Sequence, residues 1–233
     1  RSARYRLSTA DAGARIAARV TAAVPGVAPV STTTTQLLVA PTPAPEKIGA
    51  RTKPSIKGEA RLGKTLRASA GTWTVPGVRV AYQWLRGGKP IKGATSSRFK
   101  LTTKDVGKRV SVRVTARRAG YTEGVASSSA KKVAKGKPKV TAKVKNVKAG
   151  QRAKLSVRVK VAGLAKPRGT LVVRYGAKKL SVKLAAKRKG RLGVRLPRLG
   201  KGTHKIRVTF EPTGSSKKYV KKASSKRVTL RVR

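Results

Sequence analysis

The chain has 233 residues and a mass of 24.7 kDa, and its 59 lysines and arginines against 6 acidic residues give a formal net charge of +53. The absence of cysteine excludes disulfides, thiolate nucleophiles and cysteine metal sites. A hydrophobic content of 38% argues against a wholly disordered basic tail, and no apolar run approaches the roughly 20 residues that span a bilayer.

The first 40 residues repeat a later part of the chain. YRLSTADAGARIAARVTAAVPG, from Tyr5, matches FKLTTKDVGKRVSVRVTARRAG, from Phe99, at an offset of 94 residues. Identical pairs include Leu7 and Leu101, Asp11 and Asp105, Gly13 and Gly107, Arg15 and Arg109, the RVT triplets at 19–21 and 113–115, and Gly26 and Gly120. Turn and strand residues that match in one register predict that 1–40 is the C-terminal half of a truncated repeat. Since the chain also has no methionine and opens without an export signal, we expect it to be the C-terminal part of a longer protein.

The next segments alternate between linkers and strands. APTPAPEK at 40–47 is rich in proline, which predicts an extended linker at 41–51. Within 52–134, apolar Val110, Val112 and Val114 alternate with polar residues, a pattern that indicates a half-buried strand. KGKP at 135–138 predicts a short basic linker, after which 139–233 is predicted to form another domain.

The last unit has the same two-residue period. Its alternating apolar runs are Leu155, Val157, Val159 and Val161, then His204, Ile206, Val208 and Phe210, and finally Val228, Leu230 and Val232. Turn-rich segments such as 86–90 and 198–202 separate the strands along the chain. No amphipathic helix pattern is present. The sequence therefore predicts an all-β chain of sandwiches.

Residues 54–134 resemble a bacterial, chiefly actinobacterial, Ig-like repeat that occurs in tandem on secreted and surface proteins. The motifs that carry the resemblance are LGKTL at 62–66, GTW at 71–73, YQWLR at 82–86, PI at 90–91, GA at 93–94, Leu101, DVG at 105–107 and VRVT at 112–115. Residues 139–233 are similar to a second bacterial Ig-like family, through GT at 169–170, Tyr175, Leu199, GTH at 202–204, Phe210 and the strand at 226–233. The resemblance implies tandem Ig-like β-sandwiches and an extracellular or cell-surface location.

The predicted core centres on one indole. Trp84 and Tyr82 share an alternating run, where the indole fills the space between two sheets without the disulfide of antibody domains. Trp73 follows a Gly-Thr turn and is expected to pack there, with an exposed ligand contact as the alternative. Asp105 is expected to accept backbone hydrogen bonds in a turn. The other predicted core residues are Val110, Val112, Val114, Ile206, Val208 and Phe210.

No catalytic or metal site is predicted, and no cofactor is expected. The single histidine, His204, has core parity in its strand and is expected to be packed or close to a turn. Paired-carboxylate catalysis and calcium binding need acids close together. The six carboxylates are instead spread over three units, at Asp11, Glu46, Glu59, Asp105, Glu123 and Glu211. We therefore expect the chain not to be an enzyme.

The cationic side chains lie on the predicted outer faces of the strands. Part of this charge is explained by solubility and by protection of strand edges against pairing with other chains. A surface covered with lysine and arginine also binds polyanions, because binding releases the counterions condensed on the polymer. The predicted contacts are Arg113, Arg117, Arg118, Arg158, Lys160, Arg174, Lys187, Arg188, Lys189 and Arg207. The expected partners are anionic cell-envelope polymers or glycans and upstream domains of the same polypeptide. Nucleic acid is supported by charge alone, because no recognition helix and few aromatic residues are present.

Three functions stay open at this point. The favoured one is a non-catalytic spacer and adhesive module of a secreted or cell-surface bacterial protein. The second is a set of accessory modules of an exported hydrolase whose catalytic domain lies upstream. The third, an intracellular nucleic-acid-binding protein, explains the charge but leaves the Ig-like motifs without a reason.

Overall fold

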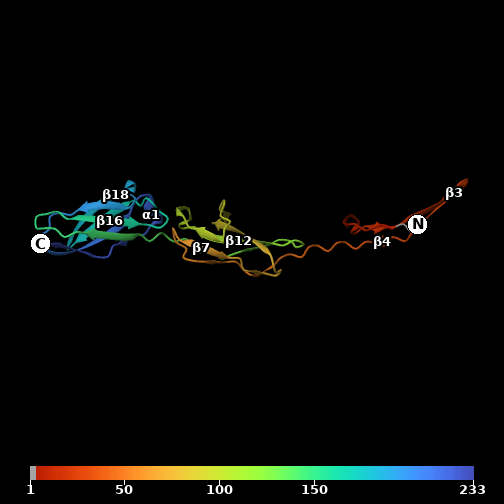
Figure 1. The fold of residues 1–233 in the computed structure, drawn as a ribbon, viewed down its shortest axis with the longest axis horizontal. Coiled ribbons are helices and arrows are strands. Elements are labelled where there is room, and N and C mark those ends of the chain that lie inside the picture. Colours follow the sequence, from red (N-terminus) through yellow and green to blue (C-terminus); the bar gives the residue numbers. More distant parts are fainter. Residues whose placement is uncertain (1–3) are drawn as a thin grey trace. The chain divides into compact units, whose positions relative to one another are not determined.

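The structure, a computed structural model, describes residues 4–233, and these are almost entirely strands and turns. The fold-class prediction of an all-β chain of tandem Ig-like sandwiches is confirmed (Figure 1). The chain forms two compact units. The first runs to Lys47 and includes Gly120–Thr122, and the second holds Ile48–Ala119 and Glu123–Arg233. In residues 4–233, no helix has the length and apolar character needed to cross a membrane.

The first unit contains two small antiparallel pairs. Its elements are the 3-10 helix η1 (Thr9–Asp11) and the strands β1 (Arg15–Ile16), β2 (Arg19–Val24), β3 (Val27–Thr33) and β4 (Leu37–Leu38). β1 pairs with β4, and β2 pairs with β3. Every residue of β2 and β3 is exposed, so these strands bury no core within the part of the unit that the structure describes.

The second unit begins with a sandwich of two sheets. Its elements are β5 (Ala50–Thr52), β6 (Ser55–Lys57), β7 (Thr65–Ser69), β8 (Thr72–Trp73), β9 (Arg79–Arg86), β10 (Lys89–Pro90), β11 (Arg98–Lys100), η2 (Thr103–Asp105), β12 (Arg109–Arg117), β13 (Gly124–Ser127) and β14 (Lys131–Lys132). One sheet has the order β11-β7-β6, and the other has the order β10-β9-β12-β13 with β14 also on β12. β5 pairs with β8. Neighbours that are distant in sequence, such as β9 and β12, are typical of the Ig-like sandwich.

A second sandwich follows in the same unit. Its elements are β15 (Lys139–Val144), β16 (Lys154–Lys160), β17 (Gly169–Tyr175), β18 (Lys178–Leu184), η3 (Ala186–Arg188), β19 (Arg191–Arg195), β20 (Gly202–Pro212), α1 (Ser215–Tyr219), β21 (Ala223–Ser224) and β22 (Val228–Val232). A β15-β16-β19 sheet faces a sheet ordered β18-β17-β20-β21, with β22 also on β20. The sequence did not predict α1, because five residues are too few to show a helical period.

Strand alternation builds both cores. In β16, Leu155, Val157 and Val159 are buried, and the residues between them are exposed. The same pattern in β12 buries Val110, Val112 and Val114. Successive side chains of a strand point to opposite faces. The apolar residues of each strand therefore face the core, and the basic residues between them face water.

The segment at 135–138, predicted as a linker, is held by backbone hydrogen bonds. The amide of Gly136 donates to the carbonyl of Tyr219 at 2.8 Å, and the amide of Lys221 donates back to the Gly136 carbonyl at 2.9 Å. Leu62, from the turn between β6 and β7, is buried in the core that the second sandwich supplies. The two sandwiches therefore share a packed junction inside one unit.

Candidate functional site

The outer face of the β15-β16-β19 sheet is cationic because of its register. Arg158 lies opposite Arg191 on one side and Thr141 on the other. Two residues away along β16, on the same face, Ser156 lies between Lys143 and Gly193. Short side chains thus line the middle of the face, and long basic ones stand around them.

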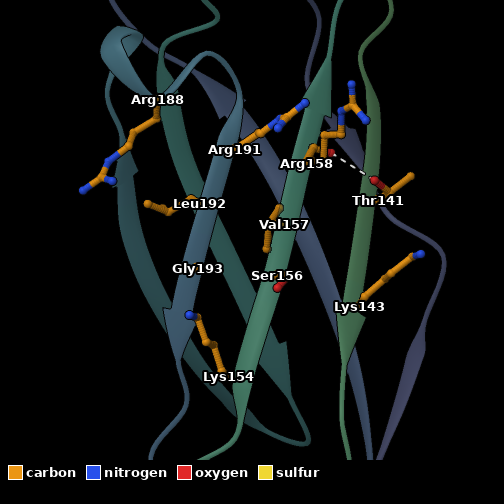
Figure 2. Close-up of a pocket in the computed structure, with 10 residues that line it drawn as sticks. All are labelled: Thr141, Lys143, Lys154, Ser156, Val157, Arg158, Arg188, Arg191, Leu192 and Gly193. Atoms are coloured by element: carbon orange, nitrogen blue, oxygen red, sulfur yellow. Dashed lines mark hydrogen bonds between the residues drawn. The ribbon is translucent and has the colours of Figure 1, made fainter.

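This arrangement leaves a hollow of about 620 Å³, shown in Figure 2. Ser156 and Gly193 form its floor, where β16 and β19 run side by side. Five basic side chains surround the floor, namely Lys143, Lys154, Arg158, Arg188 and Arg191. Gly193 has no side chain, so nothing rises from the floor at this position.

A second hollow, of about 770 Å³, shares Lys143, Lys154 and Ser156 with the first. It continues toward the end of the β15-β16 hairpin, where Lys145 and Arg152 add two more cations. We call the two hollows together the β16 groove. Because the two hollows share three residues and both open to solvent, the groove fits a linear ligand lying across both better than a small enclosed one.

The chemistry of the β16 groove is that of an anion site. Among the described residues that line the two hollows, none is acidic and none is aromatic. Guanidinium groups such as those of Arg158 and Arg191 bind phosphate and carboxylate through paired hydrogen bonds. Without aromatic side chains, the groove has no platform on which nucleobases could stack. It can hold an anionic backbone but has nothing to read bases.

The opposite sheet of the same sandwich carries a smaller basic hollow of about 530 Å³. Arg174 and Arg207 lie opposite each other there, with Lys205 and Arg227 nearby. His204 also lines it, with Nε2 at 2.9 Å from the carbonyl oxygen of Gly200, so the histidine is tied to the preceding turn.

The predicted polyanion contacts are distributed over several surfaces. Arg158 and Arg188 line the β16 groove, with Lys187 and Lys189 beside Arg188 in sequence, whereas Arg174 and Arg207 lie on the opposite sheet. Lys160 lines a separate hollow that also contains Glu59. Arg113, Arg117 and Arg118 belong to the first sandwich.

Two of those first-sandwich arginines are engaged within the protein. Nε of Arg117 donates to Glu123 at 2.8 Å, and Nη1 of Arg118 donates to the Pro76 carbonyl at 2.6 Å. They are therefore less available to a ligand than the arginines of the groove.

Sequence reasoning missed five groove residues, namely Lys143, Lys145, Arg152, Lys154 and Arg191. Lys154 could have been predicted from the sequence, because it alternates with the buried residues of β16 in the same way as Arg158 and therefore faces water on the same side. Arg191 could be placed beside Arg158 only after the strand register was known.

The predicted core residues occupy the interiors of the two sandwiches. Trp84 is fully buried, stacks on Phe99 with ring centroids 5.3 Å apart, and donates from Nε1 to the Ser96 carbonyl at 2.8 Å. Tyr82 and Trp73 are partly buried against the same cluster. Among the described side chains, Nε1 of Trp73 is buried without a hydrogen-bond partner. Fully buried positions include Val110, Val112, Val114, Ile206, Val208 and Phe210.

Asp105 has a larger structural role than a turn cap. Its buried carboxylate accepts hydrogen bonds from the amide and hydroxyl of Thr102 at 2.7 and 2.8 Å. Nε of Arg86 donates to the other carboxylate oxygen at 2.6 Å, an ion pair that the sequence did not predict. These contacts use both oxygens, which makes Asp105 a structural residue.

The remaining acids lie apart from one another. Glu59 pairs with Arg61, and Glu211 pairs with Lys222. Within residues 4–233, no three of the histidine and carboxylate side chains gather as a metal site would require.

No family model matches the chain, and no curated protein matches it. The similar solved structures include a chicken interferon gamma receptor alpha chain (10% identity, TM-score 0.49, 77% of this chain and 98% of that one). They also include fibronectin(III)-like modules of Clostridium thermocellum CbhA (13% identity, TM-score 0.29, 77% and 93% covered) and a bacterial ice-binding adhesin (11% identity, TM-score 0.29, 81% and 66% covered). TM-scores this low say nothing about what the present chain binds.

Proposed function

We propose that the chain is a non-catalytic spacer and adhesive module of a secreted or cell-surface bacterial protein, and that its β16 groove binds linear anionic polymers of the cell envelope. The observation that carries this proposal is the groove itself. Its two joined hollows bring seven basic side chains around a floor of small residues, and no acidic residue lines either hollow among those described.

The energetics favour a long polymer over a single anion. Each lysine or arginine that meets a phosphate releases condensed counterions, and the gain accumulates with the number of contacts along the polymer. Exposed ion pairs taken singly contribute only about 0–1 kcal/mol, so one phosphate would bind weakly. A phosphodiester chain without bases fits the absence of aromatic side chains from the groove.

Binding of poly(glycerol phosphate) tests the proposal. We expect the affinity to fall steeply as salt rises, because each contact adds about one to the slope of log K against log salt concentration. Titration calorimetry at several salt concentrations measures this slope. Tight binding that persists at about 1 M salt would contradict an electrostatic mechanism.

A matched pair of double variants separates the groove from the general coat. Arg158→Ala with Arg191→Ala removes an arginine pair that lies across β16 and β19 in the groove. Arg67→Ala with Arg98→Ala removes an equivalent exposed pair across β7 and β11. The groove variant should lose more affinity than the control variant, and the slope of its log K against log salt concentration should fall by about two. Equal losses would show that binding is spread over the whole surface, and tighter binding of oligothymidylate of equal charge would favour nucleic acid.

A further inference from the structure

The first unit repeats several backbone hydrogen bonds of the second half of the following sandwich. The amide of Gly13 donates to the Val39 carbonyl at 2.9 Å, as that of Gly107 does to Val133 at 2.8 Å. The amide of Thr34 donates to the Ala18 carbonyl at 2.8 Å, and the corresponding amide of Ser128 donates to the Val112 carbonyl at 2.9 Å. Strand register also agrees, because β2 pairs with β3 at the positions that correspond to the pairing of β12 with β13.

The two copies differ sharply in exposure. Val114 is fully buried and Leu101 is 1% exposed, whereas the corresponding Val20 and Leu7 are 59% and 54% exposed. In the complete sandwich, this face is covered by Ile56, Leu66 and Trp84, which belong to its first half. The first unit therefore presents the core face of a sandwich without the half that would cover it. A face of exposed apolar side chains that is buried in a complete copy of the same fold is typical of an interaction site.

Two further differences between the copies mark the same face. Phe99 stacks on Trp84, and its counterpart Tyr5 is 69% exposed. Arg86 donates to Oδ1 of Asp105, whereas Oδ1 of the corresponding Asp11 accepts from the Tyr5 hydroxyl at 2.9 Å.

One strand edge is also open. β12 pairs with β9 over eight residue pairs on the edge away from β13. Within the described residues, the corresponding strand β2 pairs only with β3. An unpaired strand edge beside an apolar face is a template for an added strand.

We propose that this face, formed by β1–β4 with the open edge of β2, is the acceptor for the N-terminal half of a repeat of the same kind. That half has the pattern of residues 48–94, with a tryptophan that stacks on Tyr5 and an arginine that pairs with Asp11. The sequence match with residues 52–134 extends to Ser2 and Arg4, which correspond to Ser96 and Arg98, so the missing partner of this face is the segment that precedes Ser96 in the complete repeat. The proposal does not depend on polyanion binding.

The test joins a second copy of residues 48–94 directly to the front of the full chain. Amide hydrogen exchange in β2 should then slow by about a hundredfold or more, because its open edge and apolar face become covered. A control insertion carries Trp84→Ala and Arg86→Ala in the added copy, and it should give much less protection. The original sandwich, from 52 to 134, reports in every sample that the chain is folded.

Two outcomes would overturn the proposal. Exchange in β2 that stays as fast as in the unmodified chain, while the original sandwich remains protected, would show that the face does not accept this half. Protection that appears in the unmodified chain as its concentration rises would show that a second copy of the chain covers the face in place of such a half-repeat.

Discussion

Trp84 holds the first complete sandwich together at the scale of single residues. It is fully buried, stacks on Phe99 and satisfies its indole N–H. We expect Trp84→Ala to lower the free energy of unfolding of this sandwich by roughly 3–5 kcal/mol, since it leaves a large cavity. Chemical denaturation followed by circular dichroism measures the loss. Val125→Ala, at an exposed position, is the control and should change stability by less than about 0.5 kcal/mol. A Trp84→Ala variant as stable as the parent would show that the indole is not in the core.

Asp11 offers a pH-dependent test of the turn it caps. Hydrogen bonds from the amide and then the hydroxyl of Ser8, and a third from Tyr5, lower the pKa of Asp11 from its ordinary 3.8. Because the pKa is lower in the folded turn, ionised Asp11 stabilises the turn above its ordinary pKa. This contribution is lost as the pH falls through the lowered value.

We therefore expect Ser8→Ala to raise the pKa of Asp11 toward its ordinary value, because one donor to the carboxylate is lost. Carboxyl NMR titration of the full chain gives the shift. Tyr5→Phe, the comparison variant, should raise this pKa by less. An Asp11 that titrates at 3.8 in the parent would show that the capping turn does not form in solution.

At the scale of strands, repulsion between neighbouring basic side chains lowers the stability of the sheet. Arg158 and Arg191 lie directly opposite each other, and like charges in that position destabilise a sheet. We expect Arg191→Glu to stabilise the second sandwich by about 0.2–1 kcal/mol while weakening its binding of polyanions. Thermal unfolding and the calorimetric titration measure the two effects. Arg191→Gln should give a smaller gain, and a destabilised Arg191→Glu variant would contradict the repulsion.

At the scale of the whole second unit, glycines allow the two sandwiches to meet. A Cβ on Gly63 would lie 2.3 Å from the carbonyl carbon of Ala162, and one on Gly163 would lie 2.8 Å from Cα of Gly63. Nη1 of Arg61 donates to the Lys135 carbonyl at 2.9 Å, and Nζ of Lys135 donates to Lys217 at 2.8 Å. Close backbone contact and the burial of Leu62 hold the two sandwiches together at this junction.

We expect Gly63→Ala to separate the two sandwiches, because the new methyl group has no room against Ala162. NMR relaxation should then give a distinct tumbling time for each sandwich. Gly77→Ala is the matched control, since Gly77 also has a positive φ but nothing lies within 4 Å of its Cβ position. Tumbling as one body in Gly63→Ala would mean that the junction is held by other contacts.

Much of the fold was readable from particular residues. The alternation of Val110, Val112 and Val114 predicted a half-buried strand, and the 94-residue offset related the first unit to the next one. The ion pair of Arg86 with Asp105 was not predictable, because 19 residues separate the two and only the pairing of β9 with β12 brings them together.

The sequence by itself determined which side chains face inward and which face water, because the two-residue period of a strand is a local property. It therefore determined that lysine and arginine coat the sandwiches. Only the tertiary structure decided where that coat becomes a groove. Register between β15, β16 and β19 places Ser156 and Gly193 side by side beneath basic neighbours, and register depends on contacts between distant segments.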